Sequence, residues 1–525
     1  MRGLTFILAF SIFFINAIVL CFYKNVRVYK YYFCAVGKKQ PKPVLQQVTI
    51  TDYAAEGKAL LRIEGKVIFV AGAVPGDVAD VQLTKNKKDW AEGRAIKIHQ
   101  YSTDRVQPFC IHFGVCGGCK WQMLPYQKQL LYKQQEAAQN LYRIGKLGDD
   151  TAFLPIKGAP QTTQYRNKLE FTASNKRYLE TLPQRSNTEV SSESALIDTD
   201  SGAEEPVDNT ITTAGAIGFH APRIFDKIID IYECHLMDNV NNSIRNCLRD
   251  YVKTNNLELY DIRNHTGWLR NIIVRLCRTG ALMVNVCVNN DDEVHLPKML
   301  NYLLAQIPTI TTLLYTINPK WNDSIYDLEP KVFFGPGYVT ETLEHFTFII
   351  SPKSFFQTNT AQAEALYTIT RDFAGLTGTE TLYDLYCGTG SIGIFCSALA
   401  KKIIGVELIE EAITDAKKNA ELNNINHAHF FAGDVIKICN ADFFETHGYP
   451  DVIITDPPRA GMHEKLVNKL LEIAAPKIVY VSCNTATQAR DIALLAEKYK
   501  VEKVQPVDMF PHTHHIECVA LLTLK

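Results

Sequence analysis

From about residue 351 to the C-terminus, short apolar runs alternate with amphipathic stretches. The apolar runs are rich in Val and Ile and have the length of buried strands, whereas Glu410–Asn423 and Ala486–Lys498 have helical spacing. Strands that alternate with helices predict a doubly wound, Rossmann-like α/β domain at 346–525 with a mostly parallel sheet. The expected strands are Thr381–Leu385, Lys402–Val406, His429–Ala432, Asp451–Thr455, Lys477–Ser482 and Cys518–Thr523.

Residues 46–105 have a different pattern, in which short alternating runs end in turn residues. Lys66–Val70 is one such run, and the Pro-Gly pair in Val74–Asp77 predicts a turn. Many short strands in so small a segment predict an OB-like β-barrel. Its basic residues suit contacts with phosphate groups, although a solvated hairpin would carry similar lysines. These residues are Lys85, Lys87, Lys88 and Arg94.

The middle of the chain, 106–345, mixes both patterns and predicts an α+β domain. A helical stretch at Gln127–Leu147 precedes strand-like pieces such as Ile272–Leu276 and Ala281–Val286. Residues 186–213 interrupt this pattern, because they are rich in Ser, Thr, Asp and Glu and poor in aromatic residues. We therefore expect a disordered insertion there.

The N-terminal segment, 1–40, is strongly apolar. Leu4–Tyr23 is a run of 20 residues without a charge, which is long enough to cross a bilayer as a helix. Arg2 precedes the run, and more positive charge follows it at Lys24 and Arg27, so the rest of the chain would stay on the cytoplasmic side. The segment is expected to be either a membrane anchor or an over-extended gene start, and the working domains are expected in the cytoplasm.

Composition narrows the class of protein. The chain has 525 residues, 46% of them hydrophobic and 21% charged, which indicates a globular protein with several domains. The net charge of -1 excludes a protein that is basic overall, so any contact with nucleic acid must use local patches. Fourteen cysteines are too few for a disulfide scaffold of this length.

Three cysteines lie close together at Cys110, Cys116 and Cys119, with two glycines between the last two. Three thiolates in one loop suit zinc or an iron–sulfur cluster, and both metals remain open from the spacing. A fourth ligand must come from elsewhere in the chain, and Cys234 is the best candidate. Unligated structural cysteines are disfavoured by the Gly-Gly turn.

A glycine loop, Asp384–Ser391, follows the first predicted strand of the α/β domain. Its glycines allow a tight turn and a close approach of the backbone to a ligand, as in a nucleotide-phosphate site or a structural turn. Glu407 ends the next strand, where an acid accepts hydrogen bonds from ribose hydroxyls, and Asp434 follows the third strand and suits an adenine amino group. NAD would use the same acid, but no Gly-x-Gly-x-x-Gly motif occurs, so S-adenosylmethionine fits better.

Two reactive side chains lie at strand ends of the same predicted sheet, Cys483 and Glu517. Directly after the predicted strand Asp451–Thr455, the segment Asp456–Arg459 contains two prolines that stiffen this loop. Uracil C5 is a poor nucleophile, but addition of a thiolate to C6 activates it, and a base must then remove the C5 proton. Each residue alone has another interpretation. Cys483 could be a structural cysteine packed in the core, and Glu517 could be a solvated acid in a loop.

Five motifs together resemble the RNA uracil-5 methyltransferase family, and more closely its branch that modifies 23S ribosomal RNA. The similarity covers roughly 46–525, and it implies an S-adenosylmethionine-dependent methyltransferase domain preceded by a TRAM barrel. The motifs are Ser351–Asn359, Asp384–Ser391, Asp456–Arg459, Ser482–Asn484 and Asp508–Glu517.

The resemblance also implies roles for individual residues. Cys483 would be the nucleophile and Glu517 the base that removes the proton. The sequence departs from the family pattern at His514, close to this base, where glycine is common. The S-adenosylmethionine site would comprise Gln357, Tyr386, Ser391, Glu407, Asp434 and Asp456. A [4Fe-4S] cluster would be held by Cys110, Cys116, Cys119 and Cys234.

The predicted activity is S-adenosylmethionine-dependent C5-methylation of a uridine in 23S rRNA. The barrel and cluster favour ribosomal RNA, because the resemblance implies that the branch acting on transfer RNA lacks both. Methylation of transfer RNA and a non-catalytic RNA-binding or ribosome-assembly role are the alternatives. Tyr165–Lys168 and Trp268–Asn271 mix charge with an aromatic ring and are expected to contact RNA, or else to be solvated strand edges. The target uridine must be flipped out to reach Cys483.

Overall fold

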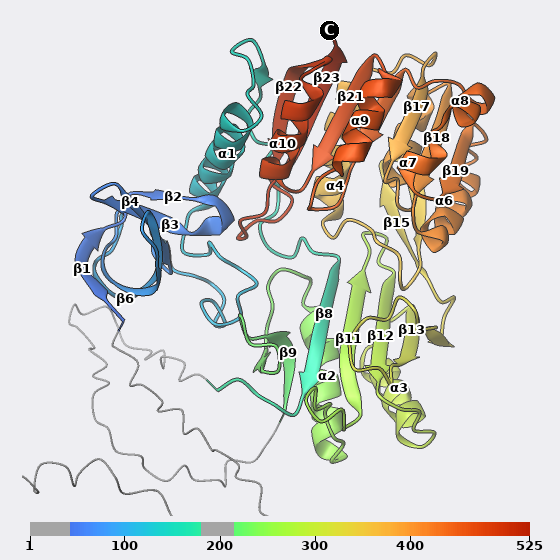
Figure 1. Cartoon of the computed structure of the whole chain (residues 1–525). Helices are drawn as coiled ribbons and strands as arrows, with labels where there is room; N and C mark the ends of the chain where they lie inside the picture. Colours follow the sequence, from blue (N-terminus) through green and yellow to red (C-terminus); the bar gives the residue numbers. More distant parts are fainter. Residues whose placement is uncertain (1–41, 180–214) are drawn as a thin grey trace, which may run out of the picture. The chain divides into compact units, whose positions relative to one another are not determined.

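A computed structural model describes residues 42–179 and 215–525 (Figure 1). The apolar run at Leu4–Tyr23 and the insertion expected at 186–213 lie outside these residues. Within the two described ranges, no helix is long and apolar enough to cross a membrane. Residues 44–525 form one compact unit, and its described part contains four β-sheets.

The first sheet has six strands in the order β1-β5-β6-β4-β3-β2, and Figure 1 shows them curled into a barrel. Alternate residues of β5 are buried, as the sequence pattern predicted, and Trp121 from the following loop closes the barrel core. The side chains of all four predicted basic residues are exposed on this barrel, and the Lys85 ammonium lies 4.6 Å from the Trp90 ring centroid. The elements are β1 (Val44–Thr49), β2 (Asp52–Tyr53), the 3-10 turn η1 (Ala55–Gly57), β3 (Ala59–Ile63), β4 (Lys66–Ala71), β5 (Val78–Asn86) and β6 (Trp90–Gln100).

The central sheet has seven strands in the order β10-β9-β8-β11-β12-β13-β14. Helices α2 (Val240–Thr254) and α3 (His295–Gln306) pack their apolar residues against one face of it. Every residue of β12 is buried, so this strand runs through the core. The strands are β8 (Lys168–Ser174), β9 (Ala216–His220), β10 (Ile228–Asp230), β11 (Leu269–Leu276), β12 (Leu282–Val288), β13 (Thr312–Ile317) and β14 (Lys331–Phe334).

The third large sheet has eight strands in the order β19-β18-β17-β20-β21-β23-β22-β7. The strands from β17 to β21 are parallel, and β23 is antiparallel to both of its neighbours. The predicted α/β fold class is confirmed. The strands are β7 (Ala152–Phe153), β17 (Thr381–Leu385), β18 (Lys402–Glu407), β19 (Ala428–Ala432), β20 (Val452–Thr455), β21 (Lys477–Ser482), β22 (Tyr499–Val507) and β23 (Glu517–Leu524).

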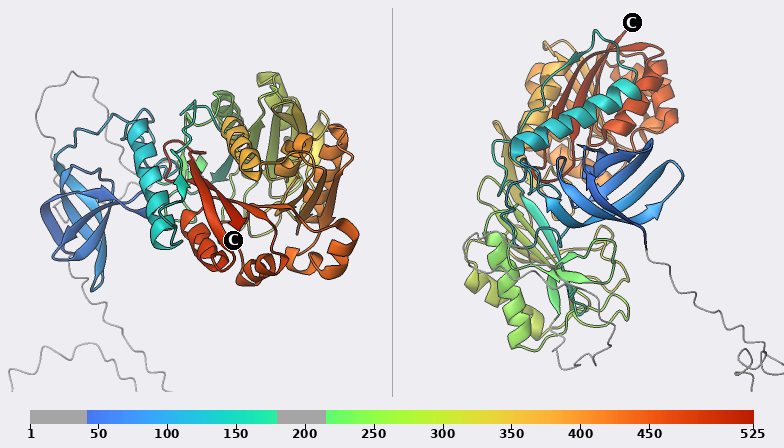
Figure 2. Two further views of the ribbon diagram at one scale, coloured as in Figure 1. Left: turned by 90° about the horizontal axis from the view of Figure 1, so that it is seen from above. Right: turned by 90° about the vertical axis from the view of Figure 1, so that its left-hand side faces the viewer.

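Helices cover both faces of this sheet, as Figures 1 and 2 show, and each face has its own hydrophobic core. A hairpin of β15 (Val339–Leu343) and β16 (Phe346–Ile350) packs into the core on one face of the sheet. That face carries α4 (Thr360–Ala374), α5 (Ser391–Phe395), the 3-10 turn η2 (Ser397–Leu399) and α6 (Glu410–Leu422). The other face carries α7 (Val435–Ile438), α8 (Ala441–His447), α9 (Glu464–Ile473) and α10 (Thr485–Leu495).

Helix α1 (Tyr126–Arg143) joins the segment after the barrel to the α/β sheet, where it packs against α10 (Figure 2). The buried Lys133 ammonium lies 2.6 Å from Asp508 Oδ1, and the Tyr126 hydroxyl donates to the other oxygen of Asp508 at 2.8 Å. A buried ion pair is costly to break, so α1 fixes the chain position just before the Met509–Ile516 loop.

Candidate active site

The strand order changes direction at β17, because β18 lies on one side of it and β20 on the other. Such a switch point opens a crevice at the carboxyl ends of parallel strands. Asp384 lies near the end of β17, Glu407 ends β18, and Asp456 directly follows β20. Three acids from distant parts of the sequence therefore meet at one edge of the sheet.

The glycine loop is folded over the end of β18. The backbone N–H of Gly388 donates to Glu407 Oε2 at 3.2 Å, and Glu407 Oε1 accepts from the N–H of Ile409 at 3.0 Å. At Gly390 the backbone has φ +75°, and a Cβ there would lie 2.9 Å from the Phe430 ring. A side chain at this position would therefore push the loop away from the sheet.

The other predicted cofactor residues lie on several different elements. Ser391 begins α5 and shares a 3.0 Å hydrogen bond with the Tyr367 hydroxyl, while the Asp434 carboxylate caps α7 by accepting from the N–H of Ile436 at 2.9 Å. Tyr386 has φ +61°, and its pKa is raised by burial and then by the charge of Asp434. Gln357 is buried just before α4.

Buried acids dominate the electrostatics of this edge. Burial raises the pKa of Asp456 to about 7, and burial together with the charges of Asp456 and Glu407 raises the pKa of Asp384 to about 7. Asp384 Oδ2 accepts from the N–H of Gly393 at 2.9 Å, whereas its Oδ1 is buried without a hydrogen-bond partner. A cationic ligand would stabilise the charged form of these carboxyls, and the sulfonium of the expected S-adenosylmethionine is such a cation.

Cys483 and Glu517 come together through the pairing of β21 with β23. Ser482 lies directly opposite Cys518 in this antiparallel pair, so the next opposed positions are Cys483 and Glu517. Burial raises the pKa of the Cys483 thiol to about 11, with a further contribution from the Glu517 charge, while burial and Asp456 raise the pKa of Glu517 well above its usual range. The predicted nucleophile and base therefore share one site with Asp456.

The loop that leads into Glu517 is held by other parts of the chain. Gln129 of α1 accepts from the N–H of His512 at 2.8 Å, and the backbone N–H of Lys120 donates to the carbonyl of His512 at 2.7 Å. His514 packs beside the barrel, since a Cβ on Gly57 would lie 3.0 Å from the Cβ of His514. The departure from the family pattern at His514 thus creates a contact between the barrel and this loop.

Two residues of this site were not predicted as functional. Asp384 lay within the glycine loop, where an acid at the strand end was the available signal. Tyr367 gave no signal, because it is one of several apolar and aromatic residues on the buried face of α4. Its pKa is raised by burial and by Asp456, Asp384 and Glu517, which places its hydroxyl among the acids.

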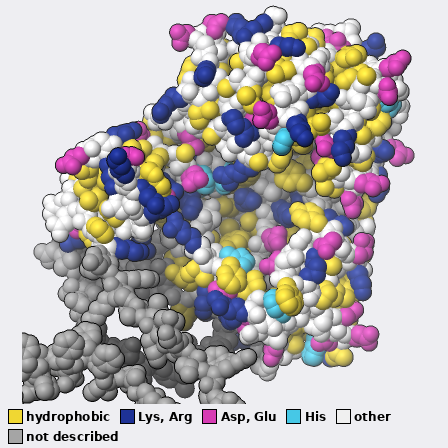
Figure 3. Space-filling view, in the orientation of Figure 1, with side chains coloured by type: hydrophobic (Ala, Val, Ile, Leu, Met, Phe, Trp, Pro, Cys, Tyr) yellow, Lys and Arg dark blue, Asp and Glu magenta, His cyan; other side chains and the backbone are white. Residues whose placement is uncertain are grey.

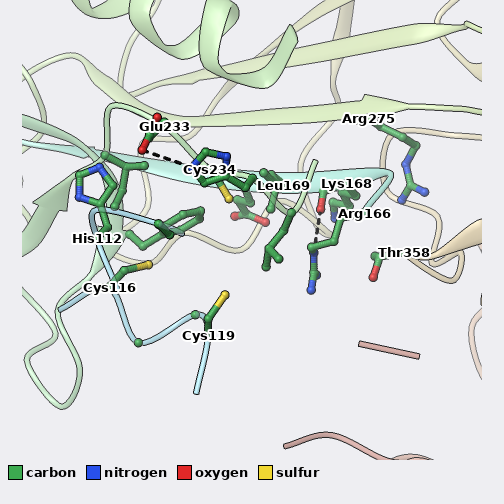
Figure 4. A pocket seen from close by; sticks show the side chains of 18 of the residues that line it. His112, Cys116, Cys119, Arg166, Lys168, Leu169, Glu233, Cys234, Arg275 and Thr358 are labelled. Atoms are coloured by element: carbon green, nitrogen blue, oxygen red, sulfur yellow. Dashed lines mark hydrogen bonds and ion pairs between the residues drawn. The ribbon is translucent and has the colours of Figure 1, made fainter. Parts of the chain in front are cut away.

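The four predicted cluster cysteines line one cavity of about 570 Å³, together with parts of β8, β11 and the 354–358 segment. Figure 4 shows Cys116, Cys119 and Cys234 at one end of this cavity, with Arg275 and Thr358 at the other. Burial, followed by interactions that include the neighbouring thiolates, raises the pKa of Cys116 to about 11 and of Cys119 to about 12. In the described part of the chain, no three His, Cys, Asp or Glu side chains are close enough to hold a single metal ion.

One of the two predicted RNA-contact segments is wrong. Trp268, Arg270 and Asn271 are buried, and the Arg270 guanidinium donates to backbone carbonyls of the Asn318–Asn322 loop. Tyr165 of the other segment is also buried, but Arg166 and Lys168 face the cysteine cavity. A mixture of charged and aromatic residues in the sequence therefore did not predict which residues are exposed and which are buried.

Comparison with known proteins decides the family. Residues 328–525 match the model of the tRNA (Uracil-5-)-methyltransferase family, and residues 45–96 match the TRAM domain. A Bacteroides thetaiotaomicron protein described as an uncharacterized RNA methyltransferase is 49% identical over 475 residues, which cover 90% of this chain and all of that protein. The chain belongs to the tRNA (uracil-5-)-methyltransferase family.

Other members of the family match along the same length. A Chlorobaculum tepidum protein, also described as an uncharacterized RNA methyltransferase, is 40% identical over 480 residues, covering 90% of this chain and 95% of that protein. The crystal structure of Pyrococcus abyssi tRNA (uracil-54, C5)-methyltransferase with S-adenosyl-L-homocysteine has a TM-score of 0.68 and 26% identity. It covers 91% of this chain and 100% of its own. The chain is therefore an S-adenosylmethionine-dependent RNA methyltransferase.

Figure 3 shows where one face of this enzyme carries positive charge. Lys and Arg side chains gather on the barrel and around a hollow in the same face, although the chain as a whole has a net charge of -1. RNA contact through local patches is the arrangement that the composition required.

Proposed function

We propose that this enzyme methylates C5 of a uridine in 23S rRNA through a covalent adduct with Cys483. The observation that carries the proposal is the placement of Cys483 opposite Glu517, next to Asp456, at the carboxyl edge of the sheet. A thiol, a carboxyl and a buried acid site for a cationic methyl donor are the parts that this chemistry needs.

Each residue has one task in the reaction. The Cys483 thiolate adds to C6 of the flipped uracil and makes C5 nucleophilic. Once C5 carries the methyl group, Glu517 removes the C5 proton, the C5=C6 bond re-forms and the thiolate leaves. Because burial and the neighbouring acids keep the thiol protonated, we expect Arg459, which opposes this shift, to favour the thiolate.

S-adenosylmethionine supplies the methyl group when it is bound. We assign its binding to the glycine loop and to the acids at the ends of β17, β18 and β20. The buried, unpartnered Oδ1 of Asp384 supports a ligand at this position, because a polar atom left unpaired is costly. The proposed contacts are Gln357, Tyr386, Ser391, Glu407, Asp434 and Asp456.

We propose that Cys110, Cys116, Cys119 and Cys234 hold a [4Fe-4S] cluster. The four thiols line one cavity, and sets of four thiolates bind either a [4Fe-4S] cluster or a structural zinc ion. We prefer the cluster because the cysteine spacing resembles that of the family's cluster site. Iron analysis tests this assignment: we expect four iron atoms per chain and a loss of iron in Cys119→Ser, whereas one zinc atom per chain would contradict it.

Transfer RNA is the second candidate substrate. The Pyrococcus abyssi relative, which matches 91% of this chain, is described as a tRNA (uracil-54, C5)-methyltransferase. A match of this extent includes the barrel, so the expectation that enzymes acting on transfer RNA lack the barrel is wrong. The preference for 23S rRNA therefore depends on the sequence resemblance alone, and the two substrates must be compared directly.

The test is methyl transfer from labelled S-adenosylmethionine to unmodified 23S rRNA and unmodified transfer RNA, with wild type beside Cys483→Ala. We expect label at C5 of uridine in 23S rRNA and a loss of at least about 10⁴-fold in the variant. Label in transfer RNA alone would overturn the substrate but leave the mechanism. Equal labelling by Cys483→Ala would overturn the covalent adduct.

A further inference from the structure

Two basic residues face each other across neighbouring strands at the end of the cavity away from the cysteines. Lys168 of β8 and Arg275 of β11 are direct partners in the strand register, and both line the cavity. Like charges placed directly opposite one another destabilise a sheet. The fold therefore keeps an arrangement that is unfavourable unless a negative group balances it.

The Arg275 guanidinium is buried and poorly paired. Only 2% of this residue is exposed, its Nη1 has no hydrogen-bond partner, and its Nη2 lies 3.5 Å from the carbonyl of Ser354. A guanidinium has five N–H donors, so a buried one normally meets carboxylates or several carbonyls. Arg270, five residues earlier on β11, is better paired: its two Nη atoms donate to carbonyls of the Asn318–Asn322 loop and to Asp323, and its Nε alone has no partner.

Positive charge exceeds negative charge around this pair. Arg166 and Arg275 both lower the pKa of Lys168, after the larger effect of burial, and Glu170 opposes them. The carboxylate of Glu341 lies near Arg275, but it already accepts from the Arg278 N–H at 3.0 Å and from the Thr360 hydroxyl at 2.7 Å. Three cations thus line this end of the cavity: Arg166, Lys168 and Arg275. Glu170 is the acid that lines the cavity beside them.

Aromatic rings complete this end of the cavity. Tyr326 and Phe355 line it, and each is 69% exposed. Large exposed rings beside cations are typical of surfaces that stack single-stranded bases. Phe355 lies two residues before the proposed cofactor contact Gln357, whose carbonyl accepts from Asn167 Nδ2 at 2.9 Å. The basic end of the cavity is therefore tied to the loop that leads to the active site.

We propose that this end of the cavity is a second nucleotide subsite for the RNA substrate. Lys168 and Arg275 bind one backbone phosphate, and Phe355 stacks on the base of that unpaired nucleotide. The cavity of about 570 Å³ is large enough for a nucleotide beside the cysteine end. The inference rests on the proposed function, because the bound nucleotide would belong to the strand that delivers the target uridine.

The test compares RNA binding by Arg275→Gln with a matched control, Lys298→Gln, which removes an exposed cation from α3 on the opposite face of the central sheet. Binding of an unmodified RNA fragment is measured over a series of salt concentrations. For Arg275→Gln we expect weaker binding and a salt dependence, log K against log salt, that is shallower by about 1. The control should keep the wild-type slope.

Thermal unfolding of the free protein separates an RNA-binding role from a structural one. Because Arg275 is a buried cation with one long hydrogen bond and an Nη1 that has no partner, we expect Arg275→Gln to raise the Tm of the RNA-free protein. A lower Tm with an unchanged salt slope would overturn the proposal and make Arg275 a structural residue. Phe355→Leu should weaken RNA binding about tenfold without changing the salt slope.

The outcome is independent of the methylation assay. If the salt slope changes in Arg275→Gln but wild type labels no uridine, the subsite stands and the proposed reaction falls. If wild type labels uridine and Arg275→Gln binds RNA with the wild-type slope, the reaction stands and the subsite falls.

Discussion

The carboxyl edge of the α/β sheet and the cysteine cavity are both built from buried charged or ionisable groups, but their positions are fixed in different ways. At the sheet edge, parallel strands bring Asp384, Glu407 and Asp456 together because each lies at or next to a strand end. In the cavity, Cys119 and Cys234 come from loops far apart in the sequence. Regular strand geometry is enough for the first site, whereas the second needs a complete tertiary structure.

The difference also concerns charge. The sheet edge holds acids whose pKa values are raised by burial, which suits a cationic methyl donor. The far end of the cavity holds cations, Lys168 and Arg275, which suits an anionic RNA backbone. One substrate complex would thus satisfy both regions, with opposite signs at the two ends.

The largest effect that separates the two regions is expected for Glu517→Gln. Without the base, the C5 proton stays in place and Cys483 cannot leave, so turnover should fall about 10²- to 10⁴-fold. A covalent protein–RNA adduct that survives denaturing electrophoresis should accumulate in this variant. The affinity for RNA and its salt dependence should stay at the wild-type values.

The double variant Glu517→Gln/Cys483→Ala is the matched control, because it should form no adduct. An adduct in the double variant, or none in the single variant with full methyl transfer, would contradict the assigned roles of base and nucleophile.

Sequence patterns predicted the first region much better than the second. Cys483 and Glu517 were predicted because each adjoins an apolar strand, and their opposition follows from the antiparallel β21–β23 pair. Tyr367 was missed because a tyrosine on a buried helix face has no functional signature. Strand β22 was not predicted either, since its alternation of Lys500, Glu502 and Lys503 with apolar residues gave no continuous apolar run.

In the cavity, sequence reasoning named the cysteines but not the cations. Arg275 lies in an apolar run and looks like a solvated strand residue until the register places it opposite Lys168. The prediction for Trp268–Asn271 was wrong because Arg270, which was expected at the surface, is buried. Its guanidinium donates to carbonyls of a loop that follows some 50 residues later. Partners that are distant in sequence decide both cases, and local spacing does not reveal them.

The next largest effect is expected where helix α1 holds the catalytic loop. In Lys133→Met the buried Asp508 loses its ammonium partner, so we expect a loss of about 3–5 kcal/mol in the free energy of unfolding. The comparison is Lys469→Met, which removes a partly exposed pair with Glu472 and should cost less than about 1 kcal/mol. Denaturant unfolding followed by tryptophan fluorescence measures both.

The same variant tests how firmly the two regions are connected. Lys133 also donates to the carbonyl of Phe510, in the loop before Glu517, so Lys133→Met should lower kcat more than it weakens RNA binding. Equal losses in the Lys133→Met and Lys469→Met variants would show that the buried pair has no special role.

The smallest effect is the pH dependence of S-adenosylmethionine binding, and its sign follows from the acids of the sheet edge. In the free enzyme the pKa values of Asp384 and Asp456 are both about 7, and a bound cation lowers them, so binding releases protons. Affinity should therefore rise with pH and level off above pH 7, with about tenfold tighter binding at pH 8 than at pH 6 for each group that ionises. Because these pKa values lie above those of the unfolded chain, the ligand-free protein should lose stability as pH rises from about 4 to 7.

Calorimetric titration of the protein with S-adenosylmethionine in two buffers of different ionisation enthalpy measures the protons released on binding, and Asp384→Asn should release fewer than wild type. Binding that is independent of pH between 6 and 8 would place the methyl donor away from these carboxyls.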